Sequence, residues 1–418
     1  MKKVLQNISR NDLVIFFCML LISSLFWSEF LITIAMIGLA ASAVFKSDLA
    51  NTWRRFTANR AYLVITILFF IVLISGLYSE NMDYWLERLR IKLPFLVLPF
   101  VFAGIGHINE RTYHALFYFM VVLATMFSIG VGINYALNFE EINLAIKQSR
   151  AMPTPTNHIR FSLLLALSIL AGGLLFLRKF YWKYPWERWL IFGCTFVLFF
   201  FIHILSVRSG LFALYCAAFF LVLRYIWMSG RVIFGVGILI AMVSIPILAY
   251  QYIHSFRTKI DLIVWNYKMY KEGNVQDYSD TRRIYSYAVG LDVAADSPLI
   301  GVGAGDIKTE VYKNYEKNLQ SFQPMLPHNQ YLFVYVSTGI IGLVLFLGAV
   351  FYPLFYKRHY EDGLFVAFHL IVFLSFMVEN TIENAVGVAF YIFFLLLGLN
   401  YLDGKRDQST KENGMVSE

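Results

Sequence analysis

Three short polar segments carry the arginines and the histidine that could bind an anion and move a proton. Arg208 stands in the segment LSVRSG, in a turn between two apolar runs so short that its guanidinium must lie at a membrane edge. A lone arginine at such a place is commonly an interfacial anchor. The turns expected on the same side are otherwise poor in Lys and Arg, so we interpret Arg208 as a phosphate-binding group.

Arg282 and Arg283 form the second segment, inside the one long polar stretch of the chain. The apolar residues that follow have the spacing of an amphipathic helix lying on a membrane: Ile284, Tyr285, Tyr287, Ala288 and Leu291. Two arginines in the first turn have the wrong sign for the helix dipole, and together with the free backbone N–H groups they would bind an anion. From spacing alone, a solvated arginine pair is an equally good interpretation.

His328 is the third candidate, in the segment PHNQYL where the polar stretch meets the next apolar run. It is the only histidine in the second half of that stretch. Imidazole is the side chain best suited to proton transfer near neutral pH. A lone histidine at an interface is usually incidental, and the neighbours in the motif are what favour a general base here.

The elements that hold these side chains must be membrane helices. The chain has 418 residues, of which 59% are hydrophobic and 15% charged, so it cannot be water-soluble. Cys18, Cys194 and Cys216 lie in apolar runs without metal-ligand spacing, and neither a disulfide framework, a metal site nor a cofactor is expected. The net charge of +8 lies mostly in short loops, so it reports topology and does not indicate nucleic acid as a partner.

Apolar runs of membrane-spanning length recur along the whole chain and predict about twelve transmembrane helices. The expected spans are 12–27, 30–45, 61–78, 93–107, 112–137, 158–177, 189–206, 209–227, 232–250, 329–356, 363–380 and 384–402. The fourth is short enough to be re-entrant. Lys and Arg gather in alternate loops, and by the positive-inside rule those loops and both termini are cytoplasmic. The loops 138–157 and 251–328 then lie outside.

The chain resembles the O-antigen ligase family, which also contains O-antigen polymerases and protein O-oligosaccharyltransferases. The resemblance is carried by residues 206–214 around Arg208, by Arg282 and Arg283 with the helix and the segment SPLIGVG that follow, and above all by PHNQYL with TGIIGL after it. The motif region covers about residues 190–350, and PHNQYL with TGIIGL is its most specific part. Taken alone, SPLIGVG predicts only a tight turn.

The resemblance implies an all-α polytopic protein of the bacterial inner membrane, with both termini cytoplasmic and a periplasmic active site. Its organisation would be transmembrane helices 1–9 in residues 1–250, a periplasmic loop with short amphipathic helices in 251–328, helices 10–12 in 329–402 and a cytoplasmic tail in 403–418. The implied reaction is a metal-independent transfer of a glycan from undecaprenyl pyrophosphate to an acceptor hydroxyl, most simply that of lipid A-core.

The family roles map onto few residues. Arg208 would hold the pyrophosphate, either Arg282 or Arg283 would be the loop arginine of the family, and His328 would be the general base. The other expected substrate-binding residues are Arg160, at the outer start of the sixth helix, and Asn329 and Tyr331 in the histidine motif.

Two glutamates near the last outer turn are expected to be structural, and three other activities remain open as alternatives. Glu379 and Glu383 flank the last outer turn, and we interpret them as interhelical hydrogen-bonding groups rather than a catalytic pair. A polymerase would use a second lipid-linked repeat as acceptor, and a protein glycosylase a Ser or Thr hydroxyl. A transporter of lipids or glycans would form no covalent product, and the absence of a convincing internal repeat weakens that alternative.

Overall fold

The computed structural model of the protein describes residues 9–44, 48–272, 279–319 and 322–415, and all regular secondary structure in these ranges is helical. In chain order the helices are α2 (Arg10–Ser24), α3 (Glu29–Val44), α4 (Leu49–Ala58), α5 (Arg60–Ser75), α6 (Met82–Gly104), α7 (Glu110–Leu137), α8 (Phe139–Lys147), α9 (His158–Leu177), α10 (Glu187–Leu205), α11 (Arg208–Ser229), α12 (Val232–Tyr252), α13 (His254–Lys271), α14 (Ser279–Asp296), α15 (Ile307–Asn318), α16 (Gln330–Phe355), the 3₁₀ helix η1 (Tyr356–Glu361), α17 (Gly363–Val378) and α18 (Ala385–Met415).

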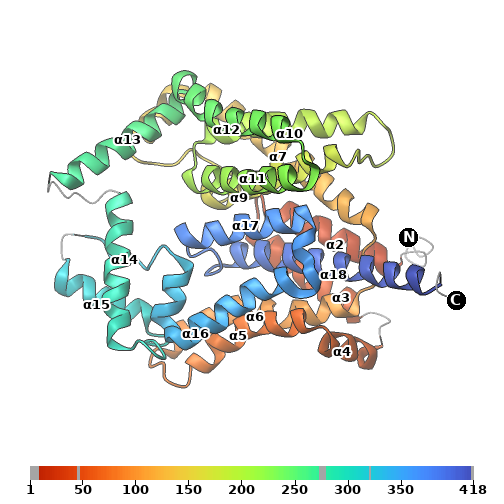
Figure 1. Ribbon diagram of the computed structural model, residues 1–418. Helices are drawn as coiled ribbons and strands as arrows, with labels where there is room; N and C mark the ends of the chain where they lie inside the picture. Colours follow the sequence, from red (N-terminus) through yellow and green to blue (C-terminus); the bar gives the residue numbers. More distant parts are fainter. Residues whose placement is uncertain (1–8, 45–47, 273–278, 320–321, 416–418) are drawn as a thin grey trace, which may run out of the picture.

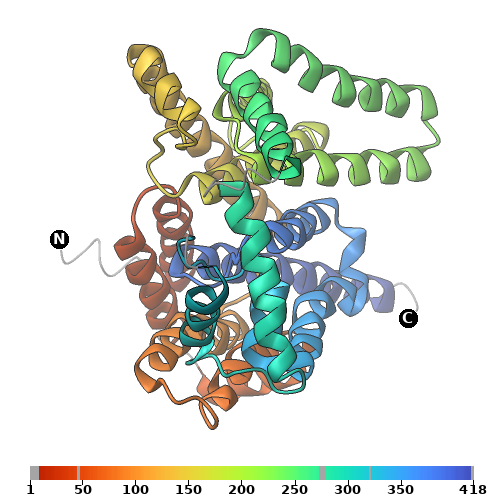
Figure 2. The ribbon, with the colours of Figure 1, turned by 90° about the vertical axis from the view of Figure 1, so that its left-hand side faces the viewer.

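The long helices run side by side between two ends of the molecule (Figure 1). One end, which we call the terminal end, holds the start of α2 and the last turns of α18. There Arg10 donates to the carbonyl oxygens of Ser42 and Gly104 at 2.9 and 2.8 Å, and Arg178 pairs with Asp362 at 2.9 Å. The opposite end, the loop end, is made by α13, α14 and α15, and Figure 2 shows α14 crossing it.

Seven of the described helices are long and apolar enough to cross a membrane, namely α7, α9, α10, α11, α12, α16 with η1, and α18. The pair α4 and α5, bent by 88°, would add an eighth, and α3 and α17 are shorter apolar helices. The protein is therefore a multi-pass helical membrane protein. The count of twelve spans stays a prediction.

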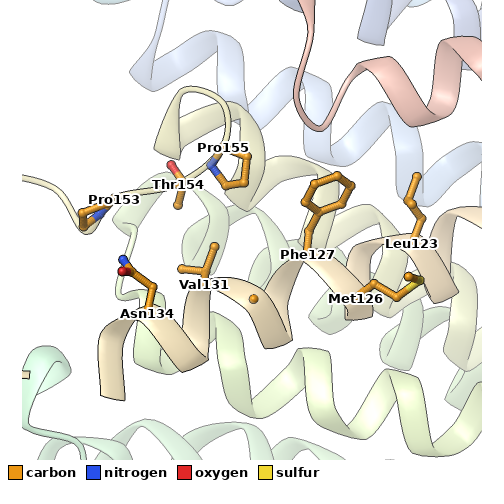
Figure 3. A pocket seen from close by; sticks show the side chains of 9 residues that line it. Leu123, Met126, Phe127, Val131, Asn134, Pro153, Thr154 and Pro155 are labelled. Atoms are coloured by element: carbon orange, nitrogen blue, oxygen red, sulfur yellow. The ribbon is translucent and has the colours of Figure 1, made fainter. Parts of the chain in front are cut away.

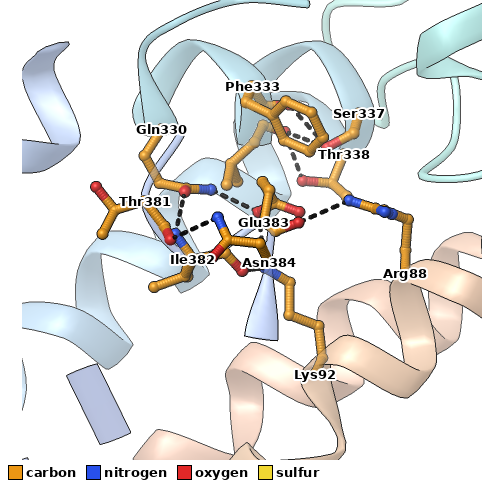
Figure 4. A network of polar contacts seen from close by, with 11 residues as sticks. Arg88, Lys92, Gln330, Phe333, Ser337, Thr338, Thr381, Ile382, Glu383 and Asn384 are labelled. Atoms are coloured by element: carbon orange, nitrogen blue, oxygen red, sulfur yellow. Dashed lines mark hydrogen bonds and ion pairs between the residues drawn. The ribbon is translucent and has the colours of Figure 1, made fainter. Parts of the chain in front are cut away.

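The expected span at 93–107 overlaps only the second half of α6, which runs from Met82 to Gly104. α6 begins at Met82, and its first half carries Arg88 and Lys92, whose charges interrupt the apolar pattern of the sequence. Lys92 is nevertheless buried, because its ammonium group pairs with Glu383 at 2.7 Å (Figure 4). A hydropathy pattern cannot predict this pairing, so it does not indicate that the helix extends back to Met82.

A small apolar cluster joins the loop end to α16. Its buried members are Val289, Val293 and Ala294 of α14, Ile307, Val311 and Tyr315 of α15, and Phe333 and Val336 of α16. α14 therefore packs on α16 and is held above the end of the bundle. α17 packs on both α11 and α16 and so connects the helices that begin with Arg208 and just after His328.

The glycine-rich turn after α14 docks into a break in α16. Gly339 interrupts the helix with φ 65° and ψ −169°. Across the break, the Val302 N–H donates to the Val336 carbonyl at 3.0 Å, and the Ile340 N–H donates to the Pro298 carbonyl at 2.9 Å. The helix thus exchanges some of its own hydrogen bonds for bonds to the turn, and this fixes the path by which the loop reaches the membrane helices.

This junction gives a stability prediction. A Cβ atom at Gly339 would lie 2.2 Å from the carbonyl atoms of Leu299, and the positive φ disfavours any other residue. We expect Gly339→Ala to lower the free energy of unfolding by about 1–3 kcal/mol. Thermal unfolding in detergent would measure it, with Gly348→Ala as control because a Cβ there meets nothing within 4 Å. Equal melting temperatures for the two variants would contradict the docking.

Candidate active site

His328 and Glu379 form a pair at the loop end. His328 lies just before α16, and Glu379 ends α17 in an extended conformation, with φ −156° and ψ 150°. The imidazole Nδ1 lies 3.3 Å from Oε2 of Glu379, and the two side chains are 25% and 8% exposed. An ionised carboxylate only accepts, so Nδ1 carries the proton and donates it. The Nε2 atom then has its lone pair available, and within the described residues it has no hydrogen-bond partner.

The backbone around His328 is also held. The Tyr287 hydroxyl donates to the His328 carbonyl oxygen at 2.9 Å, and the His328 N–H donates to the Ser286 hydroxyl at 3.5 Å. Both partners lie on α14, so this helix holds the backbone of His328 in place. The geometry is that of an oriented base, in which one ring nitrogen is anchored by a carboxylate.

Positive charge surrounds the carboxylate of Glu379. Burial alone would raise the pKa of this carboxyl, but the hydrogen bond from His328 and the charges of His328, Arg283 and Arg160 outweigh burial and lower the pKa. His158, in the first turn of α9 with Arg160, is within electrostatic reach of the same groups. The Nε atom of Arg160 is buried and has no hydrogen-bond partner among the described residues. Arg160 and Arg283 thus lie within electrostatic reach of the pair.

The lowered pKa of Glu379 predicts how stability changes with pH. A carboxylate with a depressed pKa stabilises the folded state above its ordinary pKa of 4.5, and this contribution is lost as the pH falls through the folded-state value. We expect the melting temperature of wild type to approach that of Glu379→Gln as the pH is lowered from about 7 to about 3.5. A difference between them that does not change with pH would contradict an ionised Glu379 in the native pair.

Arg208 lies beside this cluster in a separate recess. It begins α11 after Ser206, whose φ of 54° ends α10 in a left-handed turn. Gly210, two residues further on, lies against Ser162 of α9, so the first turns of α9 and α11 adjoin. Arg208 and Lys259 line a cavity of about 230 Å³ whose other walls are almost entirely apolar. Arg208 and Arg160 therefore lie at the same end of the bundle.

Two expected substrate-binding residues have structural contacts. The Asn329 side chain accepts from the Leu332 N–H at 3.0 Å, which caps α16, and donates to the Met377 carbonyl at 3.1 Å. The Tyr331 hydroxyl donates to the Phe373 carbonyl at 3.2 Å. Both side chains hold α16 on α17, and through them the position of His328.

Residues 193–347 match the model of a protein family described as O-Antigen ligase. The match covers 155 of the 418 residues, and it supports the resemblance to the O-antigen ligase family over this part of the chain. No curated protein matches the chain. The resemblance drawn from Arg208, Arg282, Arg283 and the motif of His328 is thereby confirmed, and members of this family are glycosyltransferase-like enzymes.

The O-antigen ligase match covers α11 and α14, which carry Arg208 and Arg283, and His328 with the start of α16 that follows it. Arg160 and Glu379 lie outside it. The expectation that Glu379 and Glu383 are interhelical hydrogen-bonding groups agrees with the structure: Glu379 accepts from His328 at 3.3 Å, and Glu383 accepts from Gln330 of α16 at 2.7 Å. The sequence alone does not identify His328 as the partner of Glu379, although one feature points to this pairing: Glu379 lies in a turn that is expected on the same side of the membrane as His328.

Proposed function

We propose that the protein is an O-antigen ligase-type glycosyltransferase that moves a glycan from undecaprenyl pyrophosphate to a hydroxyl of lipid A-core. The observation that carries the proposal is the His328–Glu379 pair with Arg283 and Arg160 around it at one end of a membrane bundle. A base next to cationic groups is what transfer from a pyrophosphate leaving group requires. The family match supports the same class of enzyme.

In this mechanism the acceptor oxygen attacks the anomeric carbon of the donor sugar. The bond between that carbon and the pyrophosphate oxygen breaks, and the pyrophosphate leaves with the electron pair. His328 takes the hydroxyl proton on Nε2, while Glu379 accepts from Nδ1 and stabilises the imidazolium that forms. Arg283 and Arg160, with Arg208 at the neighbouring recess, offset the negative charge that grows on the pyrophosphate.

The donor lipid fits the recess of Arg208. The cavity next to Arg208 and Lys259 is lined by Leu211, Phe212 and Phe256, and its apolar wall would take the start of a polyprenyl chain beside these two cations. The loop end would face the periplasm, because Arg10, Arg178 and the other basic loops lie at the terminal end. Both chain termini would then be cytoplasmic in the inner membrane, and the chain would cross it twelve times.

An apolar groove on α7 supports a lipid-anchored acceptor (Figure 3). It has a volume of about 520 Å³ and runs from Leu123 to Asn134, about 16 Å at 1.5 Å per residue. The loop of Pro153 and Pro155 covers it and continues into the first turn of α9, which holds Arg160. An acyl chain in this groove would bring a lipid head group to the cationic cluster, on a different helix from the recess of Arg208.

Filling this groove is a direct test of the acceptor. A Cβ at Gly130, in the groove, meets nothing within 4 Å, so Gly130→Leu adds bulk without disturbing the packing. We expect the KM for a lipid acceptor to rise about tenfold, because an occupied groove costs roughly 1.4 kcal/mol or more of binding, with the KM for the donor unchanged. Gly193→Leu on α10 is the matched control, since its Cβ also meets open space. A rise in the donor KM instead would assign the groove to the polyprenyl chain.

The proposed function is tested with purified protein, glycan-loaded undecaprenyl pyrophosphate and a chelator, offered lipid A-core, a second lipid-linked repeat or a peptide with Ser and Thr. We expect product on lipid A-core. Product only on the lipid-linked repeat or the peptide would make the protein a polymerase or a protein O-oligosaccharyltransferase. Movement of the donor across vesicles without any covalent product would favour the transporter.

A further inference from the structure

Lys92 and Glu383 form a buried ion pair that the proposed mechanism does not use. Lys92 is 4% exposed and Glu383 8%, and Nζ lies 2.7 Å from Oε1. Removing two charges from water costs several kcal/mol per ion, and an apolar pair of similar volume is often as stable. Stability therefore does not explain why a buried ion pair stands here. The contacts that the pair makes with other segments suggest its role.

The pair holds both segments of the active site at once (Figure 4). Gln330 donates to Glu383 at 2.7 Å and accepts from the Ile382 N–H at 3.0 Å. Lys92 also donates to the Ile382 carbonyl at 2.6 Å, and Arg88 donates to the Glu383 carbonyl at 2.8 Å. The turn after α17 is thereby bound through its carboxylate and its backbone to α6 and to the first residue of α16.

These contacts are close in sequence to the catalytic pair. Gln330 follows His328 by two residues, and Glu383 follows Glu379 by four. His328 and Glu379 come from different helices, so the distance between them depends on how these two segments are held. A buried cluster in which the donors and acceptors satisfy one another is rigid, since breaking any one contact leaves a buried polar group unpaired.

We infer that Lys92 is a positioning residue that fixes the geometry of His328 and Glu379 through Glu383, Ile382 and Gln330. The inference rests on the proposed function of His328 as base. Lysine suits the task because one ammonium group can donate to a carboxylate and a backbone carbonyl together, and its charge neutralises the buried carboxylate. Lys92 does not touch substrate in this account.

The experiment compares wild type with Lys92→Met, Lys92→Arg, Glu383→Gln and the double variant Lys92→Met/Glu383→Gln. Lys313→Met, on the exposed face of α15, is the control for loss of a lysine. Melting temperature, kcat, KM for the donor, and the rate at which diethyl pyrocarbonate modifies His328 are measured for each. The last readout needs no substrate, so it separates failure of this inference from failure of the proposed function.

We expect Lys92→Met to lower kcat about 10- to 100-fold, as loss of a residue that orients a reacting group commonly does, with the donor KM unchanged. His328 should be modified faster, because its ring is less firmly held. The double variant removes the unpaired buried charge and should regain melting temperature but not kcat, while Lys92→Arg should recover part of kcat. Folded Lys92 variants with wild-type kcat and wild-type His328 modification would overturn the inference and leave the pair a purely structural contact.

Discussion

Replacing His328 by alanine is expected to lower kcat by about 10²- to 10⁴-fold, which is the usual contribution of a positioned general base. The donor should still bind, because the arginines that would hold its pyrophosphate are on α9, α11 and α14. Initial rates of glycan transfer and donor binding to the purified variant measure the two effects separately.

The control for this variant is His254→Ala, which removes an exposed histidine at the start of α13 from the same end of the molecule. It should transfer glycan at the wild-type rate. If folded His328→Ala keeps wild-type kcat, the base lies elsewhere and the pairing with Glu379 has another purpose.

Replacing Arg283 by alanine should have the second largest effect, and a larger one than replacing Arg282. The charge of Arg283 lowers the pKa of Glu379, so this arginine lies within electrostatic reach of the His328–Glu379 pair. We expect Arg283→Ala to reduce kcat/KM for the donor by about 10²- to 10³-fold, as removal of a group that stabilises a growing anion does. Arg283→Lys should restore only part of it, because an ammonium group lacks the two-pronged geometry of guanidinium.

Arg282→Ala is the matched comparison, since it removes the same group from the adjacent residue of α14. We expect it to stay within about tenfold of wild type, the effect of a charge near but not at the site. A greater loss for Arg282→Ala than for Arg283→Ala would reverse the assignment and place Arg282 at the pyrophosphate.

The parts of the site that could be predicted from the sequence are those that sit in local motifs. His328 and the arginine pair stand out because each is a polar group at the margin of an apolar run. The partner of His328 could not be read in this way, because Glu379 is 51 residues away and only the packing of α16 on α17 brings the two together. Lys92 and Glu383 are 291 residues apart and meet for the same kind of reason.

Hydropathy predicted where helices exist better than where they begin. Apolar composition suffices to place α7, α9 and α12, but α6 starts earlier than its apolar run because a partner on another helix neutralises Lys92. The break at Gly339 was hidden for a related reason. Its conformation is set by the glycine-rich turn that docks there, and the local sequence of α16 does not predict that contact.

The most direct test of a single active site at the loop end is a structure of the protein with a non-transferable analogue of the glycan-loaded undecaprenyl pyrophosphate. A single active site at this end predicts pyrophosphate density in contact with Arg283 and Arg160, and the anomeric carbon facing Nε2 of His328 with room for one hydroxyl between them. Pyrophosphate bound away from both arginines, or a sugar that His328 cannot reach, would contradict it.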